Sequence, residues 1–135
     1  MSAGDVFFDT NVLLYLLAAD AAKADCAEAL IAGGGTVSVQ VLNEFAAVAL
    51  RKLAMGVREI REVLGVVRAV CLIAPLSVAT HERALDLVAR VSLSFYDALI
   101  VAAAQEAQCG ILYSEDMQDG RTIGDVTIRN PFRGG

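Results

Sequence analysis

Residues 6–15 have the sequence VFFDTNVLLY, in which a short apolar strand passes directly into an apolar helix. The first three residues are β-branched or aromatic, as strand residues commonly are. Asp9, Thr10 and Asn11 then interrupt the apolar pattern at the junction. A carboxylate in such a buried place needs a hydrogen-bond partner or a cation. The stretch therefore predicts a strand end where Asp9 either caps the following helix or belongs to a functional site.

Beyond this stretch, the chain predicts strands that alternate with helices. The expected strands are residues 5–8, 36–39, 71–76, 111–114 and 125–130, the last at a sheet edge. The expected helices are residues 11–17, 21–32, 41–54, 57–70, 78–91 and 95–108. This alternation implies right-handed crossovers and a mostly parallel sheet of four to five strands. We expect one domain over residues 1–135, since no linker or repeat divides the chain.

The composition fits a folded domain without a membrane span, because 56% of the 135 residues are hydrophobic but no apolar run is long enough. Arg68 and Pro75 interrupt the longest apolar run, residues 63–79. No basic region precedes the apolar part of the N-terminus, so we expect no signal peptide. The three cysteines are far apart and show no metal-binding spacing, which favours small buried side chains in a reducing cytoplasm. We expect the single histidine, His81, on a helix surface.

The charge balance is acidic, with 16 acids, 11 bases and a formal net charge of −5. Such a balance normally argues against a nucleic-acid partner. It misleads where several acids converge and a cation neutralises them. The bases are also clustered, and five of them form a predicted local positive patch within eighteen residues: Arg51, Lys52, Arg58, Arg61 and Arg68.

Four acids occupy positions where chemistry is expected, and each also has a simpler interpretation. Asp9 fits a helix N-cap, and Asp97 fits a capping box with Ser94. Glu44 lies early in a helix that looks apolar nearly all round, yet it fits an exposed helix end as well. Asp116 follows the fourth expected strand and fits a solvated turn. Taken singly, none of these acids demonstrates a site.

Together the four acids predict a metal site, because a parallel sheet brings its carboxyl strand ends to one edge. Asp9 and Asp116 follow strand ends, and Glu44 and Asp97 lie near the starts of following helices. Four uncompensated carboxylates would repel one another and raise each other's pKa. Mg²⁺ or Mn²⁺ would relieve this repulsion, whereas zinc is disfavoured without histidines or cysteines nearby. An acid-only metal site indicates phosphoryl chemistry, in which the ion lowers the pKa of an attacking water.

Four stretches, FFDTNVLLY, VSVQVLNEF, SFYDALIVAAA and LYSEDMQDG, together resemble the PIN domain and, within it, the VapC-type ribonuclease toxins. They occur in the family's order between residues 7 and 120. The resemblance implies a three-layer α/β/α sandwich with a central parallel sheet. It also implies a Mg²⁺- or Mn²⁺-dependent endoribonuclease that leaves a 5′-phosphate and a 3′-hydroxyl.

The resemblance assigns the catalytic and metal-binding acids to Asp9, Glu44, Asp97 and Asp116. Asp9 and Asp97 are the expected main metal ligands, Glu44 binds the ion or orients water, and Asp116 completes the site. The side chains expected to support these carboxylates are Thr10, Asn11 and Ser114. Two neighbouring acids, Glu115 and Asp119, receive no role.

The resemblance further implies an RNA substrate, a homodimer and a cognate antitoxin that wraps a hydrophobic groove and inserts a basic side chain among the acids. Apolar helix faces at Val12–Tyr15 and residues 57–70 would supply these surfaces or, equally, ordinary core. The alternative function is a catalytically inactive PIN-like module that binds RNA or protein. Metal-dependent RNA cleavage would separate the two.

Overall fold

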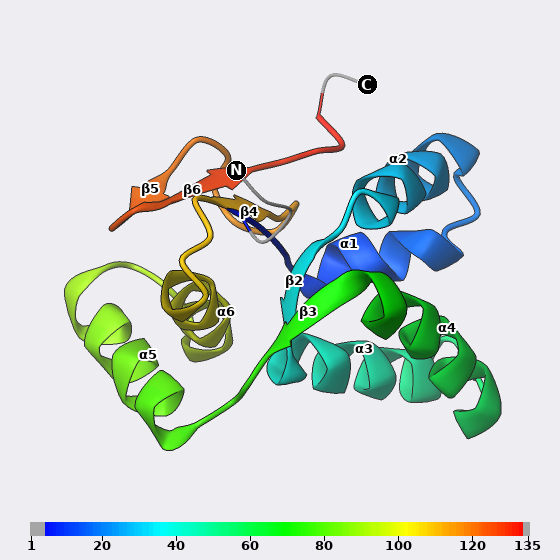
Figure 1. The fold of residues 1–135 in the computed structure, drawn as a ribbon, viewed down its shortest axis with the longest axis horizontal. Helices are drawn as coiled ribbons and strands as arrows, with labels where there is room; N and C mark the ends of the chain where they lie inside the picture. The colour runs from blue at the N-terminus through cyan, green and yellow to red at the C-terminus, as the bar shows by residue number, and fades with distance from the viewer. Residues whose placement is uncertain (1–4, 134–135) are drawn as a thin grey trace.

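The computed structural model describes residues 5–133 and contains a central sheet flanked by helices (Figure 1). The strands are β1 (Val6–Phe8), β2 (Gly35–Ser38), β3 (Cys71–Ala74), β4 (Ile111–Tyr113), β5 (Thr122–Ile123) and β6 (Val126–Arg129). The α-helices are α1 (Thr10–Leu14), α2 (Ala21–Ala32), α3 (Val39–Lys52), α4 (Val57–Val70), α5 (Val78–Arg90) and α6 (Phe95–Glu106), and a 3₁₀ helix, η2 (Tyr15–Leu17), extends α1.

The sheet has the order β3-β2-β1-β4-β6-β5, with β1 near its centre. All neighbouring strands are parallel except β5 and β6, which are antiparallel. Figure 1 shows α5 and α6 together on one side of the sheet and α1, α2 and α4 on the other. The predicted three-layer α/β/α sandwich is therefore confirmed. Since the parallel strands share one direction, their carboxyl ends lie at one edge of the sheet.

The C-terminal part of the sheet differs from the prediction. The strand expected at residues 125–130 forms as β6 but lies inside the sheet, between β4 and β5, rather than at its edge. The strand β5 was not predicted, so the sheet has six strands instead of four to five. Gly124, at φ +61°, makes the tight turn between β5 and β6. A strand of two residues is too short to show an alternating pattern, which explains why the sequence did not predict it.

The core forms around β1 and α6. Phe7 and Phe8 of β1 are fully buried, and α6 is buried continuously from Ala98 to Ala104. Small alanines let α6 lie close to the sheet. Gly35 of β2 also permits close approach, because a Cβ there would lie 2.6 Å from Cε2 of Phe8. These contacts fix β1 between its neighbours and thereby fix the position of its carboxyl end.

The expectation that the helix of Glu44 is apolar nearly all round is wrong. In α3 one face, with Val41, Phe45 and Ala49, is buried, while Leu50 and the polar residues of the opposite face are exposed. Glu44 lies between these faces and is half-buried. Amphipathic helices of this kind cover one side of a sheet. Glu44 is therefore placed at the boundary between core and solvent.

The histidine and two of the three cysteines lie where the sequence predicts. His81 is exposed on α5, as expected, and packs edge-on against Phe95. Cys71 and Cys109 are buried, as expected, whereas Cys26 is half-buried. Over residues 5–133, no single helix is long and apolar enough to cross a membrane; only the strongly bent pair α5 and α6, at 118°, meets the length and composition criteria when the two are taken together.

Candidate active site

The pairing of β1 with β4 brings Asp9 and Ser114 together. Phe8 lies opposite Tyr113 in this parallel pair, and the amide of Asp9 donates to the carbonyl oxygen of Tyr113 at 2.9 Å. The next residues along the two strands are therefore neighbours at the carboxyl edge. There, the Ser114 hydroxyl donates to Oδ2 of Asp9 at 2.8 Å.

Asp9 is both a helix cap and the most buried of the predicted site acids. Its Oδ1 accepts from the amide of Thr10 at 2.7 Å, which caps α1 as the simpler interpretation expected. The residue is only 4% exposed. Burial raises the pKa of the Asp9 carboxyl from 3.8 to about 6, and the charges of Asp97 and Glu44 add to this rise, while the hydrogen bonds from Ser114 and Thr10 oppose it. The carboxylate is therefore held in place but poorly solvated, a state that a cation would relieve.

Glu44 reaches the same region from α3 through a hydrogen bond to the residue after Asp9. The Thr10 hydroxyl donates to its Oε1 at 2.7 Å, and the Gln40 side-chain amide donates to its Oε2 at 2.9 Å. The sequence prediction included Thr10 but missed Gln40. The i, i+4 spacing of Gln40 and Glu44 on one helix was the available signal. Both oxygens of Glu44 are thus oriented by neighbouring side chains.

Asn11 connects Asp9 to Asp116. Its Nδ2 lies 3.4 Å from Oδ2 of Asp9 and 3.2 Å from Oδ2 of Asp116. Ser114 supports the same turn, since its Oγ accepts from the backbone amides of Asp116 and Met117, each at 3.2 Å. The residues predicted to support the acids are therefore placed between them, and the exposed Asp116 is tied to the buried Asp9.

Asp97 approaches from the first turn of α6, where it is half-buried. The Ser94 hydroxyl oxygen accepts from the Asp97 amide at 3.2 Å, so this part of the predicted cap is present. Partial burial raises the pKa of the Asp97 carboxyl, and the charges of Asp116 and Glu44 raise it further. Asp97 in turn adds to the raised pKa of Asp9, so it lies within electrostatic range of the other acids.

A pocket of about 270 Å³ opens beside Glu44 and Asp116, whereas Asp9 and Asp97 are not among the residues that line it. It is lined by Thr10, Asn11, Leu14, Glu44, Ala47, Val48, Arg51 and Asp116. The donor set is all oxygen, which suits Mg²⁺ or Mn²⁺. In the described part of the chain, no three acidic, histidine or cysteine side chains are arranged as a ready-made metal site. The residues fit an ion held by one or two carboxylates and otherwise by water, as Mg²⁺ commonly is in proteins.

Glu115, which had no predicted role, fastens the loop that contains Asp116. The hydroxyl of Tyr15 donates to its Oε1, and Nζ of Lys23 lies 3.3 Å from its Oε2. Lys23 also lies 4.7 Å from the centre of the Tyr15 ring. The Glu115 amide donates to Oδ1 of Asn11 at 3.0 Å. This clasp of Tyr15, Lys23 and Glu115 was not predicted, because no local sequence pattern links residues so far apart.

Asp119 also had no predicted role, and its contacts are directed away from the acid cluster. Its Oδ1 accepts from the amide of Asn130 at 2.8 Å, and its Oδ2 lies 3.1 Å from Nη1 of Arg133. These interactions, led by the backbone hydrogen bond, lower the pKa of the Asp119 carboxyl. Asp119 therefore joins the loop after β4 to the segment after β6.

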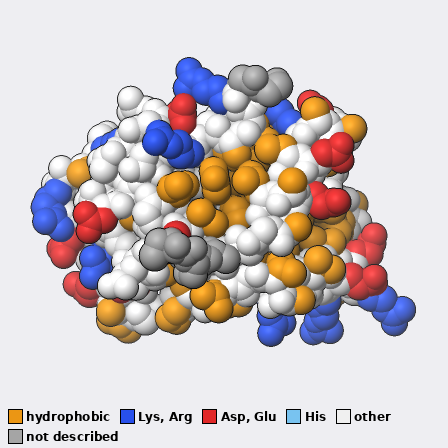
Figure 2. Space-filling model, turned by 45° about the horizontal axis from the view of Figure 1, so that its top comes forward, with side chains coloured by type: hydrophobic (Ala, Val, Ile, Leu, Met, Phe, Trp, Pro, Cys, Tyr) orange, Lys and Arg blue, Asp and Glu red, His pale blue; other side chains and the backbone are white. Residues whose placement is uncertain are grey.

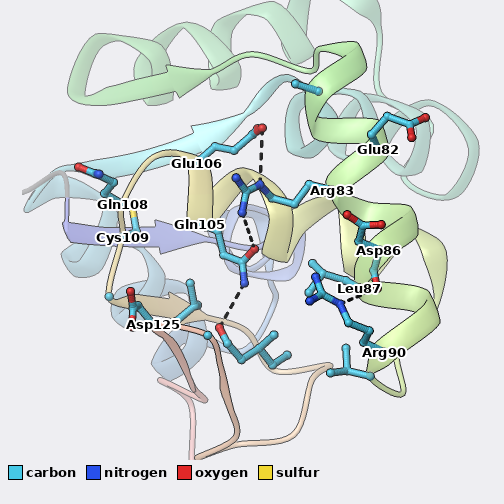
Figure 3. Close-up of a pocket in the computed structure, with 16 residues that line it drawn as sticks. Glu82, Arg83, Asp86, Leu87, Arg90, Gln105, Glu106, Gln108, Cys109 and Asp125 are labelled. Atoms are coloured by element: carbon cyan, nitrogen blue, oxygen red, sulfur yellow. Dashed lines mark hydrogen bonds and ion pairs between the residues drawn. The ribbon is translucent and has the colours of Figure 1, made fainter.

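A larger cavity, of about 1030 Å³, lies away from the four acids, between α5, α6 and the β5–β6 turn (Figure 3). Arg83 is directed toward Gln105 and Glu106, and Gln105 donates to the carbonyl oxygen of Ile123. Gly110 and Asp125, which line it, lie at the amino ends of β4 and β6. Ligand sites of parallel sheets form at the opposite, carboxyl edge. Size alone therefore does not make this cavity the active site.

The family model for the PIN domain matches residues 6–119, which include all four acids. The chain belongs to the PIN domain family. The predicted resemblance to this family is thereby confirmed. A search of curated proteins finds no significant match.

Solved structures similar to this PIN domain support the same fold. The toxin–antitoxin complex from Klebsiella pneumoniae superposes with a TM-score of 0.68 at 22% identity, covering 93% of this chain and 97% of that chain. VapC20 of Mycobacterium tuberculosis, a toxin that cleaves the sarcin–ricin loop, gives 0.64 at 22%, covering 82% and 89%. VapBC2 of Rickettsia felis, bound to a promoter DNA fragment, gives 0.64 at 17%, covering 93% and 97%. At these identities the likeness shows the fold.

Proposed function

We propose that this PIN domain is a metal-dependent endoribonuclease of the VapC toxin type, acting in the cytoplasm. The observation that favours this function most is the buried Asp9, whose carboxyl pKa is raised to about 6 amid Glu44 and Asp97. Burying a carboxylate near other carboxylates opposes folding, and a bound cation would offset this cost. Membership of the PIN family supports the same interpretation.

In this proposal, Asp9 and Asp97 are the main ligands of Mg²⁺ or Mn²⁺, with Glu44 and Asp116 completing the site. Such an ion would lower the pKa of an attacking water and offset charge on the phosphate. Glu44, whose carboxylate oxygens accept hydrogen bonds from Thr10 and Gln40, would bind the ion or orient that water. Water attack on the phosphorus then leaves a 5′-phosphate and a 3′-hydroxyl.

The proposed partners are an RNA substrate, a second copy of the chain and a cognate antitoxin. Support for protein partners comes from the molecular surface, where hydrophobic side chains gather over the middle of one face with charged side chains near its margin (Figure 2). Exposed valines of α4, Val57, Val66 and Val70, add apolar surface, whereas Val12 and Leu13 of the other suggested helix face are core residues. The similar structures from Klebsiella pneumoniae and Rickettsia felis are toxin–antitoxin assemblies.

Cleavage of an RNA pool with and without Mn²⁺ tests the proposal. We expect the wild-type protein to cut RNA only with the ion and Asp9→Asn to lose at least about 100-fold in rate, since the substitution removes a central negative charge. Asp119→Asn is the matched control and should retain activity. RNA binding without any metal-dependent cleavage would favour the alternative, an inactive PIN-like binding module.

A further inference from the structure

Arg51 is the basic side chain that lines the acid pocket. Glu44 and Asp116 line the same pocket, which has a volume of about 270 Å³. The other four residues of the predicted positive patch do not line it. A positive side chain beside two acids can bind an anion that enters the pocket.

The helix geometry of α3 directs Arg51 toward the pocket. Glu44, Val48 and Arg51 follow one another at spacings of four and three residues and therefore share a helix face. Helical side chains lean toward the helix N-terminus, and Nε of Arg51 donates back to the carbonyl oxygen of Ala47 at 3.5 Å. Seven residues separate Glu44 from Arg51, or about 10 Å along the axis. Arg51 thus lies on the pocket wall, about two turns of α3 away from Glu44.

The guanidinium of Arg51 is exposed and has spare donors. Across residues 5–133, its Nη1 and Nη2 have no hydrogen-bond or ion-pair partner, whereas Arg83 and Arg133 each pair with an acid. Glu44 makes its hydrogen bonds with Thr10 and Gln40 instead. A planar fork of N–H donors in this position suits a phosphate, which it can bind with two parallel hydrogen bonds.

We propose that Arg51 binds an RNA phosphate that neighbours, on the same strand, the phosphate cleaved at the acids. This inference rests on the proposed ribonuclease function. Approaching RNA meets the negative charges of Glu44 and Asp116, which repel its backbone. A cation among the acids offsets that repulsion for the cleaved phosphate alone. Arg51 offsets the repulsion for the neighbouring phosphate. It thereby sets which phosphate of the strand lies at the acids.

Binding of a short fluorescein-labelled single-stranded RNA of mixed sequence, followed by anisotropy with Mg²⁺, tests this role. The Asp9→Asn background prevents cleavage during the measurement. In it we expect Arg51→Gln to weaken binding about 5- to 10-fold and to reduce the slope of log K against log salt by about 0.7, the value for one phosphate of a single strand. Arg51→Lys should recover part of the affinity, since it restores charge but not the two-pronged geometry.

Lys52→Gln is the matched control, because it removes the same charge from the next position of α3 but lies outside the pocket lining. We expect it to change affinity less than about twofold, as non-specific electrostatics predict for an exposed charge. Equal losses in the Arg51 and Lys52 variants would overturn the proposal. So would failure of the parent protein to bind the RNA.

Substitution of single phosphates by neutral methylphosphonates identifies the contact. With Arg51 present, one linkage should be markedly more sensitive than the rest, and in Arg51→Gln that difference should vanish. Sensitivity that is uniform, or unchanged by the substitution, contradicts the proposal. If the wild-type protein shows this linkage-specific contact but cuts no RNA with Mn²⁺, the ribonuclease proposal fails while the Arg51 contact stands. The two failures are thereby distinguishable.

Discussion

Ser114 donates its hydroxyl hydrogen to Oδ2 of Asp9 at 2.8 Å, although 105 residues separate them along the chain. The same hydroxyl oxygen accepts from two backbone amides of the following turn, those of Asp116 and Met117. The Ser114 side chain thus orients the Asp9 carboxylate and also shapes the loop that contains Asp116. The completely buried position of Ser114 leaves water no access to replace these bonds.

Ser114→Ala should therefore lower the free energy of unfolding by about 1–3 kcal/mol, the cost of leaving buried polar groups without partners. Urea denaturation gives this value directly. Ser92→Ala is a suitable control, since Ser92 is exposed and, within residues 5–133, only its backbone carbonyl oxygen accepts a hydrogen bond, from Arg121. It should change stability by less than about 0.5 kcal/mol. Equal denaturation midpoints for both variants would show that the Ser114 hydrogen bonds contribute nothing.

The raised pKa of Asp9 makes stability depend on pH in a defined direction. Its folded value of about 6 exceeds 3.8, so the folded state binds the proton more tightly. The resulting stabilisation is complete below pH 3.8 and is lost as pH rises through about 6. Asp9→Asn removes this dependence. Without divalent cations, the stability of the variant relative to wild type should rise by about 2 kcal/mol between about pH 4 and about pH 7.5. A constant difference across that range would contradict the assigned shift.

Divalent cations should stabilise the folded protein at neutral pH. If the acids bind Mn²⁺, an ion concentration 100 times the dissociation constant adds about 2.7 kcal/mol, or roughly 4 °C in Tm for each kcal/mol. Asp97→Asn should reduce this increase. Asp119→Asn should lower the starting Tm, because the ion pair with Arg133 is lost and the hydrogen bond from the Asn130 amide no longer ends on a charged oxygen, but it should leave the metal-induced increase intact. An increase that Asp97→Asn leaves unaltered would exclude Asp97 as a ligand.

Two glycine substitutions should change stability in opposite directions. Gly35→Ala places a Cβ at 2.6 Å from Cε2 of Phe8 and 2.8 Å from Cγ2 of Val6, so it should destabilise the fold by about 1–3 kcal/mol. Gly65→Ala, in α4, meets nothing within 4 Å and should stabilise by about 0.5–1 kcal/mol through lower backbone entropy of the unfolded chain. Thermal denaturation measures both. Destabilisation of similar size at the two positions would argue against the close contact of β1 and β2.

The clasp of Tyr15, Lys23 and Glu115 should limit opening of the loop after β4. Lys23→Met removes the ion pair to Glu115 and the contact with the Tyr15 ring. Hydrogen exchange of the peptide covering residues 113–121 should then become several-fold faster, because local opening is easier. Lys52→Met, which removes no recorded ion pair within residues 5–133, serves as the control and should leave that peptide unchanged. Unaltered exchange in the Lys23 variant would mean that the clasp does not restrain the loop.

The sequence predicted the parallel part of the sheet because its strands are apolar runs bounded by glycines or polar residues. The same logic predicted that Asp9 and Asp116 share an edge, since both follow such strands. It did not predict β5, whose two residues show no alternation, or the interior position of β6. Strand order depends on which strands pair, and composition alone does not specify that pairing.

Within the candidate site, the sequence predicted the four acids as a group but only some of the side chains that hydrogen-bond to them. Thr10, Asn11 and Ser114 were found because they adjoin acids in the chain. Lys23 was not, since its contacts depend on how α2 packs beside the loop after β4. The contact of Gln40 with Glu44 could have been predicted from their spacing of four residues on one helix. Contacts between side chains that meet only through tertiary packing cannot be predicted from local sequence patterns.

The adjacency of β1 and β4 constrains when the acid cluster can form during synthesis of the chain. Asp9 is synthesised 105 residues before its neighbour Ser114, and before β6, the strand that pairs with β4. Domains fold as units during translation, after the segments that complete them have left the exit tunnel. A nascent polypeptide that lacks β4 and β6 has an incomplete sheet and no assembled acid cluster. The acids can therefore come together only after both strands have been synthesised, long after Asp9 itself.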